Sequence, residues 1–247
     1  MTNRKLLTPR RLFLVVIVCL LIPSPALSLE TIRITEASDE YDFELNVEGC
    51  GGESRNNEPN QCSGKARIGV FKKGEKSPFQ FLSLPNIEFR KDSTAHNQKK
   101  DGEGRGVYGQ EYGLVSEDFN FDGHRDLAIC NGWNGGYGGP SFTIFLFDNK
   151  SHRFIGNKQL SRLTDAPSLG LFVADMENKQ LVVHSKSGCC YHETKKFQVL
   201  NNRPALVEKV MDDSTGDMRV VTTEKLIKGK WSKSVKREQL EEKEPGQ

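Results

Sequence analysis

The sequence predicts an all-β, mostly antiparallel domain. Short segments rich in Val, Ile, Phe and Tyr recur along the chain, with turn residues between them. The 23 Gly and 10 Pro residues favour many short elements over a few long helices. With 247 residues, the chain is long enough for one large β domain or two small domains. With 36% hydrophobic and 28% charged residues, it is unlike a polytopic membrane protein or a disordered chain. A sandwich, a barrel and a small propeller remain open.

Each strand is expected where an apolar run is bounded by turn residues. In chain order, the expected strands are Thr31–Ile34, Tyr41–Val47, Ala66–Phe71, Phe79–Leu84, Asp126–Cys130, Phe142–Phe147, Leu169–Ala174, Leu181–His184, Phe197–Leu200, Ala205–Val210, Met218–Leu226 and Lys230–Val235. Hairpin turns are expected at Asp148–Lys150, Glu177–Lys179, Asn201–Asn202 and Lys228–Gly229. Only Lys158–Leu163 resembles a short helix, and the polar stretch Lys91–Gly106 predicts an exposed loop. No internal repeat supports a regular propeller.

The first 28 residues have the pattern of a secretory signal peptide. A basic start leads into the apolar run Leu12–Ile22, and the small residues Ala26 and Ser28 predict cleavage before Leu29. The apolar run is shorter than the roughly 20 residues of a transmembrane helix, which disfavours an uncleaved anchor. A lipoprotein signal is disfavoured because the bulky Val18 precedes Cys19. We therefore expect export to the periplasm or the extracellular space, an all-β binding domain over residues 29–236 and a charged, flexible tail over residues 237–247.

The charge balance gives no reason to expect a nucleic-acid partner. The formal net charge of the whole chain is +2, with 35 basic and 33 acidic residues. The basic residues Arg4, Lys5, Arg10 and Arg11 all precede the first acidic residue, Glu30. A chain that begins at Leu29 is therefore slightly acidic and has no basic surplus for a polyanion.

Export permits disulfide bonds among the cysteines that follow Cys19. A bridge between Cys50 and Cys62 is the natural expectation, because these residues bracket a polar, Gly- and Asn-rich loop. Cys130 is expected to pair with Cys189 or Cys190, which leaves one thiol over unless the two adjacent cysteines form a vicinal bridge. The spacing of these cysteines does not fit a zinc site.

The segment from Asp118 to Asp126 is the strongest motif and predicts a calcium loop. A hard dication such as Ca²⁺ takes oxygen ligands from alternating side chains and one backbone carbonyl, with a glycine at the sharp turn. The expected ligands are the side chains of Asp118, Asn120, Asp122 and Asp126 and the carbonyl of His124, with Gly123 at the turn. Ile129 stands where an EF-hand has glutamate, so the loop resembles the integrin-type FG-GAP calcium loop of β proteins. The alternative is a cluster of Asx turns that holds no metal.

Two loops are candidates for partner contact. Asn131–Pro140 is rich in glycine and contains Trp133 and Tyr137, so it either approaches a partner closely with aromatic anchors or is a long turn whose aromatics return to the core. It is not a phosphate loop, because the Lys and Ser/Thr that would follow are missing. Ser187–His192 reads Ser-Gly-Cys-Cys-Tyr-His and can carry hydrogen-bond donors into a cleft lined by carboxylates, or else cap a hairpin beside a bridge. Ser187 and His192 lack the third member of a catalytic triad, so we expect no catalytic residue.

These motifs together resemble a known family. The run from Glu117 to Val199 resembles the periplasmic immunity proteins of type IV secreted, lysozyme-like toxins, which are similar to the periplasmic inhibitors of invertebrate-type lysozyme. The matching features are the calcium loop, the glycine run to Pro140, Phe145–Asp148 with Phe154, and Ser187-Gly188 with Tyr191. The resemblance implies that Ser187 and Tyr191 meet the catalytic acids of a hydrolase, with Gly188 shaping the turn. Two cysteines separate Gly188 from Tyr191 here, which departs from the Ser-Gly-x-Tyr pattern.

The sequence thus predicts an exported, calcium-binding protein that is no enzyme. Its expected role is that of an immunity protein or lysozyme inhibitor, with a lysozyme-like peptidoglycan hydrolase as protein partner and with no nucleic acid and no small-molecule substrate. The partner-binding residues would be Ser187, Gly188, Tyr191, His192, Trp133 and Tyr137. The alternative is a calcium-stabilised adhesion or structural module of the envelope that uses the glycine loop. A hydrolase is the weakest interpretation, because a metal would occupy the paired carboxylates.

Overall fold

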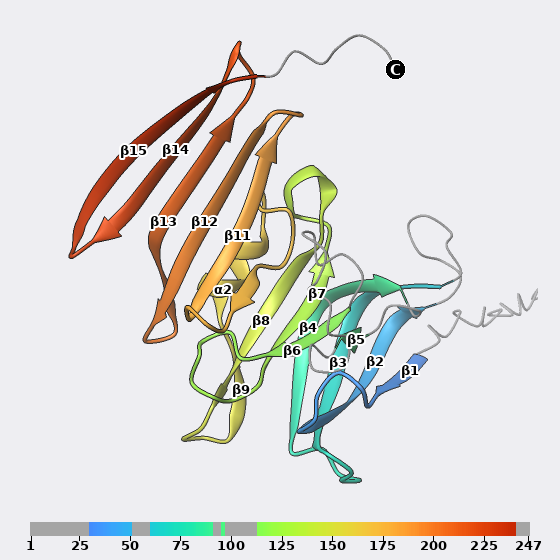
Figure 1. Cartoon of the computed structure of the whole chain (residues 1–247). Coiled ribbons are helices and arrows are strands. Elements are labelled where there is room, and N and C mark those ends of the chain that lie inside the picture. The colour runs from blue at the N-terminus through green and yellow to red at the C-terminus, as the bar shows by residue number, and fades with distance from the viewer. Residues whose placement is uncertain (1–29, 51–59, 91–94, 97–112, 241–247) are drawn as a thin grey trace, which may run out of the picture.

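The fold consists almost wholly of strands. The computed structural model describes residues 30–50, 60–90, 95–96 and 113–240. The expected signal peptide, most of the expected loop 91–106 and residues 241–247 of the expected tail lie outside these ranges. Within the described ranges the strands form three sheets and no closed barrel, which confirms the all-β, mostly antiparallel prediction (Figure 1). In the ranges described, no helix is long and apolar enough to span a bilayer.

The first sheet is an antiparallel meander of four strands closed by a disulfide. Apolar residues alternate along its second strand, so Phe43, Leu45 and Val47 share one buried face. Cys50 lies opposite Cys62 in the register of the second and third strands, and the two are bonded, as predicted. The strands are β1 (Glu30–Ile34), β2 (Tyr41–Cys50), β3 (Gln61–Lys72) and β4 (Gln80–Arg90).

The second sheet has five strands and carries both the aspartate-rich loop and the glycine loop. Its first pair of strands is parallel and the other pairs are antiparallel. A short helix, α2 (Lys158–Ser161), and the 3₁₀ turn η3 (Arg162–Thr164) follow it. The strands are β5 (Ala95–His96), β6 (Leu114–Glu117), β7 (Asp126–Gly132), β8 (Ser141–Asp148) and β9 (Arg153–Gly156).

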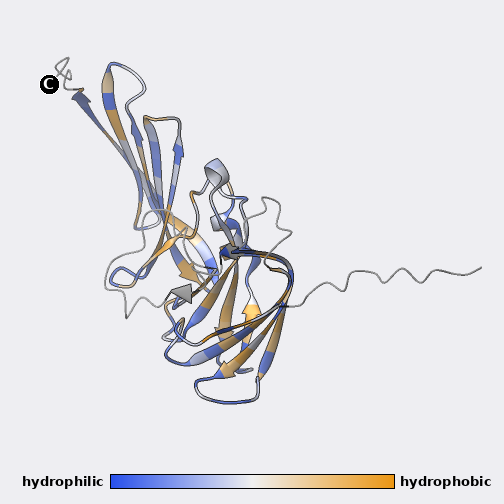
Figure 2. Ribbon diagram, turned by 90° about the vertical axis from the view of Figure 1, so that its right-hand side faces the viewer, coloured by the Kyte–Doolittle hydropathy of each residue, from blue (hydrophilic) through white to orange (hydrophobic). Residues whose placement is uncertain are grey.

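The third sheet is a meander of six strands that continues well beyond the core (Figure 1). Leu181 and Val183 are buried against the second sheet, whereas the outer strands are half-buried or exposed. Figure 2 shows hydrophilic and hydrophobic residues mixed along these outer strands. The strands are β10 (Val173–Asp175), β11 (Gln180–Ser187), β12 (Tyr191–Leu200), β13 (Arg203–Asp213), β14 (Met218–Ile227) and β15 (Lys230–Gln239).

The second sheet is buried on both faces. On β7, Leu127 and Ile129 belong to the core shared with the first sheet, whereas Ala128 and Cys130 belong to the core shared with the third sheet. β8 follows the same alternation, since Ile144 faces the third sheet and Phe147 the first. The sheets therefore pack in succession, with the second sheet in the middle, and form neither a two-layer sandwich nor a ring of blades.

Several local predictions need correction. β6 and β9 were not expected, and Ala95–His96 is a short strand inside the segment predicted to be a loop. β10 covers only Val173–Asp175, because Leu169 to Phe172 approach the core without a continuous ladder. β15 runs to Gln239, so the charged tail predicted from residue 237 begins later.

Removing a side chain from the doubly buried sheet should destabilise the protein strongly. Leu127 is fully buried, so Leu127→Ala leaves a cavity and should lower the free energy of unfolding by about 2–5 kcal/mol. Leu200→Ala is the control, because Leu200 is 56% exposed and its loss should change stability by less than about 0.5 kcal/mol. Urea denaturation measures both values, and equal effects would contradict the packing.

Candidate functional site

The Ser187–His192 segment forms the turn between β11 and β12. In the register, Ser187 pairs with Tyr191 and Lys186 pairs with His192. Because side chains alternate across a strand, Ser187 and Tyr191 share one face of the hairpin and His192 lies on the other. The expected contact residues therefore divide between two faces. Because Ser187 and His192 lie on opposite faces, the arrangement disfavours Ser187 as a nucleophile with His192 as its general base.

The two adjacent cysteines at this turn are bonded to each other. Cys189 and Cys190 form a vicinal disulfide, and Cys130 is a free, buried thiol. The predicted pairing of Cys130 with Cys189 or Cys190 is therefore wrong. Cys130 lies on β7 and faces the core, where burial raises the pKa of its thiol to about 12.

Tyr137 connects the glycine loop to the hairpin turn. Its hydroxyl oxygen accepts a hydrogen bond from the backbone N–H of Gly188, which is 51 residues away in the sequence. The ammonium of Lys186 lies 4.9 Å from the centre of the Tyr137 ring. On the other side, the carbonyl of Cys190 accepts a hydrogen bond of 2.8 Å from the N–H of Ser214, in the β13–β14 turn. The hairpin turn is thus fastened from both sides.

Tyr137 adopts a backbone conformation that is unusual for an aromatic residue. Its φ is 55°, in the left-handed region, which costs bulky residues about 1–3 kcal/mol. Gly188 is also in this region, with φ 65°, and no atom lies within 4 Å of where its Cβ would be. Backbone conformation, and not lack of space, therefore explains the glycine at position 188.

The glycines of the Asn131–Pro140 loop pack against this chain's own backbone. A Cβ on Gly136 would lie 2.5 Å from the carbonyl oxygen of Pro167, and a Cβ on Gly139 would lie 2.9 Å from that of Leu169. The N–H of Gly136 donates to Ser168, and the N–H of Ala166 donates to Asn134. The glycine loop therefore approaches the segment after η3 closely. Its aromatic residues nevertheless stay outside the core, since Trp133 is 43% exposed and Tyr137 is 66% exposed.

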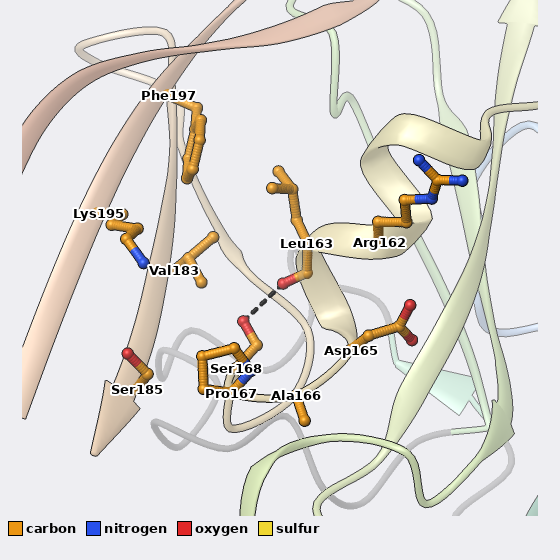
Figure 3. Close-up of a pocket in the computed structure, with 10 residues that line it drawn as sticks. All are labelled: Arg162, Leu163, Asp165, Ala166, Pro167, Ser168, Val183, Ser185, Lys195 and Phe197. Atoms are coloured by element: carbon orange, nitrogen blue, oxygen red, sulfur yellow. Dashed lines mark hydrogen bonds between the residues drawn. The ribbon is translucent and has the colours of Figure 1, made fainter. Parts of the chain in front are cut away.

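A small groove lies beside the hairpin, between residues 162–168 and the core-facing side of β11 and β12 (Figure 3). Its volume is about 150 Å³, below the roughly 300–1,000 Å³ of typical small-molecule sites. Ser185 and Lys195 line the groove, and its far wall includes Leu163 and Pro167. A single side chain of a partner matches this space better than a metabolite.

Glu193 forms ion pairs with two lysines next to this groove. Its buried carboxylate forms ion pairs with Lys195 and, at 2.9 Å, with Lys209. Burial alone would raise the pKa of Glu193, but the hydrogen bonds from the two lysines outweigh it and lower the pKa. The charge of Lys195, which lines the groove, is therefore compensated by a carboxylate next to it.

The aspartate-rich loop lies at the other end of β7. Asp118 accepts hydrogen bonds from the N–H groups of Asp122, at 3.1 Å, and Gly123, at 2.8 Å. Asp122 in turn accepts a hydrogen bond of 2.9 Å from the N–H of His124. Gly123 has φ 90°, which allows the sharp turn. Side-chain oxygens of Asp118 and Asp122 thus fold the loop onto itself as Asx turns.

Asp126 lies beneath this loop and is fully buried. One carboxylate oxygen accepts from the N–H of Phe119 and the other from the N–H of Phe147, each at 2.8 Å. Burial raises the pKa of Asp126 to about 8 despite these two hydrogen bonds, and the negative charges of Asp118 and Asp122 raise it further. The carboxylate therefore joins the loop to β8, in a place where negative charge is poorly compensated.

The loop has calcium-type ligands, but they are not gathered around one point. Throughout the described parts of the chain, no three or more His, Cys, Asp or Glu side chains are arranged as a metal site. Asn120 directs its amide nitrogen to Asp122 and to Asn202, at 2.8 and 3.0 Å. The loop fits a hard dication by its chemistry, since each oxygen that accepts one N–H keeps a further lone pair.

The predicted site residues therefore form two separate groups. The hairpin turn meets the glycine loop through Gly188 and Tyr137 at one end of β7, and the aspartate-rich loop lies at the other end. Sequence reasoning missed Ser214 and Ser168, which support the hairpin and the glycine loop through backbone groups. No pattern in the sequence could have indicated contacts made by a backbone N–H or carbonyl.

Comparison with known proteins supports the fold. No protein-family model matches the chain, and no curated protein does. A solved structure described as a Xanthomonas type IV secretion system related protein is similar, with a TM-score of 0.69 and 23% sequence identity. The match covers 85% of this chain and 96% of that one. At this identity the similarity establishes a shared fold.

Peptide mapping should reproduce this arrangement of cysteines. Without reduction, we expect one peptide pair joined through Cys50 and Cys62 and one peptide with an internal Cys189–Cys190 bridge. Cys130 should react with an alkylating reagent only after unfolding, because it is buried and its thiol remains protonated. A disulfide between Cys130 and either Cys189 or Cys190 would contradict the structure, and so would rapid alkylation of Cys130 in the native protein.

Proposed function

We propose that this chain is an exported binding protein that inhibits a lysozyme-like peptidoglycan hydrolase. The hairpin turn Ser187–His192 enters the cleft of the enzyme and competes with the glycan. The observation that carries the proposal is the fastening of this exposed turn by the vicinal disulfide, by Tyr137 and by Ser214. A turn held in one conformation loses little entropy on binding.

The chemistry of the turn suits a cleft lined by carboxylates. Glycoside hydrolases carry a pair of Asp or Glu residues on either side of the scissile bond. Ser187 and Tyr191 bring two hydroxyl donors to one face of the hairpin, and each can donate to a carboxylate oxygen. The groove beside them can receive one side chain from the rim of the cleft.

The similar solved structure agrees with this context. It is described as related to a type IV secretion system, which fits the resemblance of residues 117–199 to immunity proteins of toxins from such systems. Under this proposal the chain acts in the periplasm, after removal of residues 1–28, and it inhibits the partner without any catalysis of its own.

We further propose that Ca²⁺ binds the loop Asp118–Asp126. Asp118, Asn120 and Asp122 would supply side-chain oxygens, His124 a carbonyl oxygen, and Asp126 would complete the site. Bound calcium would offset the repulsion among Asp118, Asp122 and Asp126. Its role would be to stabilise the fold, because the loop lies at the opposite end of β7 from the hairpin turn.

An envelope adhesion module is the second candidate. The exposed Trp133 is the observation that favours it, since a large aromatic on a loop is a typical binding anchor. The two candidates differ in what Trp133→Ala does: it should abolish attachment to an envelope component only if the glycine loop is the contact surface.

Removing the two hydroxyl-bearing side chains should weaken inhibition. Tyr191→Ala should lower the affinity for the hydrolase by roughly thirtyfold, the effect of losing an anchor worth about 2 kcal/mol. Adding Ser187→Ala should weaken it further. The assay is the clearing of a peptidoglycan suspension by lysozyme-like enzymes of several classes, with and without the protein.

The matched control is Gln198→Ala, at the other end of the same strand, where the side chain is exposed. It should inhibit as the unchanged protein does. Undiminished inhibition by a folded Tyr191→Ala, Ser187→Ala variant would refute insertion of this turn, and inhibition of no enzyme in the panel would refute the proposed function.

Calcium removal should lower the melting temperature, because a ligand that binds only the folded state stabilises it. Asp122→Asn should reduce this shift, because it keeps an oxygen ligand but removes a negative charge. The melting temperature of the chelated protein should change little, since the amide oxygen can still accept the N–H of His124. Asp217→Ala, an exposed carboxylate elsewhere, should leave the shift intact. If calorimetric titration finds no binding at millimolar Ca²⁺, the calcium proposal is wrong.

A further inference from the structure

The turn between β14 and β15 combines exposed apolar side chains with unpaired positive charge. Ile227 is 52% exposed and Trp231 is 51% exposed, on either side of the two-residue turn Lys228–Gly229. Both turn residues have positive φ, 50° and 77°, which is typical of a tight type I′ hairpin. The turn is therefore a compact tip, and Figure 1 places it at the free outer end of the third sheet.

The tip is strongly basic over a short length. Residues 225–237 contain no acidic residue, and their basic residues are Lys225, Lys228, Lys230, Lys233, Lys236 and Arg237. Lys225 pairs with Glu208 at 3.0 Å and Lys233 with Glu224 at 3.3 Å. The two lysines nearest the turn, Lys228 and Lys230, are exposed and have no ion-pair partner among the described residues.

Protection of a sheet edge explains the lysines of this turn but not its exposed apolar side chains. Lysines along β15 discourage pairing with another strand, as on many edge strands. That purpose gives no reason to expose an aliphatic residue and a tryptophan at the turn. In the register, Ile227 pairs with Lys230 and Trp231 pairs with Leu226, so Ile227 and Trp231 lie on opposite faces of the hairpin. An exposed apolar side chain on each face of a protruding tip, with lysines beside it, matches the composition of the interface between lipid headgroups and acyl chains.

We propose that the β14–β15 tip binds the surface of an anionic phospholipid bilayer. The hairpin enters with its tip first, so Ile227 on one face and Trp231 on the other reach the boundary between headgroups and acyl chains, while Lys228 and Lys230 contact the phosphates. Anionic headgroups attract each nearby lysine, while the amphipathic indole ring is favoured at this depth. The tip lies at the other end of the third sheet from the β11–β12 turn, so both can be engaged at once (Figure 1). This inference does not depend on the proposed inhibition.

Vesicle sedimentation tests the proposal. The chain should sediment with vesicles of phosphatidylcholine mixed with phosphatidylglycerol, weakly with phosphatidylcholine alone, and less at high salt. Lys228→Glu with Lys230→Glu should lower the partition coefficient at least tenfold, and Ile227→Ser with Trp231→Ser should do the same. All these side chains are exposed, so both double variants should keep the melting temperature.

The matched control is Lys150→Glu with Lys179→Glu, which makes the same change of charge at two other hairpin turns and should alter partition less than twofold. Every variant keeps the same N-terminal residues, so any contribution of the apolar run at 12–22 cancels in the comparison. In a Trp133→Phe background, the emission of Trp231 should shift to the blue when anionic vesicles are added.

Four results would overturn the proposal. The first is equal partition of the tip and control variants, and the second is equal binding to both kinds of vesicle. The third is binding without a shift of Trp231 emission and without any effect of Ile227→Ser and Trp231→Ser, because the contact would then be attraction by charge alone. Self-association through β15, seen as a dimer in sedimentation that the tip variants abolish, would also refute it if anionic vesicles did not compete.

Discussion

Burial of both faces of the second sheet is the constraint on which the other features depend. β7 alternates between two cores, so its direction and register are fixed from both sides, and a shift by one residue would exchange Leu127 and Ile129 with Ala128 and Cys130. The aspartate-rich loop enters this strand and the glycine loop leaves it. Both loops therefore start from a backbone that packing holds in place, and Asp126 adds a link from the first loop to β8.

The same constraint explains what could be predicted from the sequence. The runs Asp126–Cys130 and Phe142–Phe147 are nearly continuous in apolar residues, which indicated buried strands correctly. β6 was missed because two of its four residues, Ser116 and Glu117, are polar yet buried. β9 was missed because only Phe154 of that strand is buried, so it shows no alternating pattern. A short segment carries too little periodicity when tertiary packing decides its structure.

Some features of the candidate site could be predicted from the sequence and others could not. The Cys50–Cys62 bridge could be predicted because a hairpin brings residues near in sequence together. That Cys130 stays a free thiol could not be predicted, because its burial depends on the packing of two sheets. The residues of the hairpin turn were identified, but not their division between two faces, which follows from the register of Ser187 with Tyr191. Tyr137 differs most from the expectation. An aromatic residue in a glycine-rich loop predicted a contact with a partner, whereas in the structure its hydroxyl oxygen accepts a hydrogen bond from the N–H of Gly188.

The third sheet poses a physical question, because its outermost strands, β14 and β15, extend beyond the core (Figure 1). Leu181 and Val183 anchor β11 in the core, and Phe197 and Val199 of β12 pack against the same core. The outermost strands, β14 and β15, depend mainly on the ladder to the strand before them. Cross-strand ion pairs such as Glu208 with Lys196 and Lys225 assist, but surface pairs contribute little, so stability should decrease toward β15. A contact that binds the folded edge raises the stability of the outer strands by linkage. Strands of 10 residues span about 33 Å. The length of the strands separates the turn that we propose enters an enzyme cleft from the tip that we propose binds an anionic bilayer.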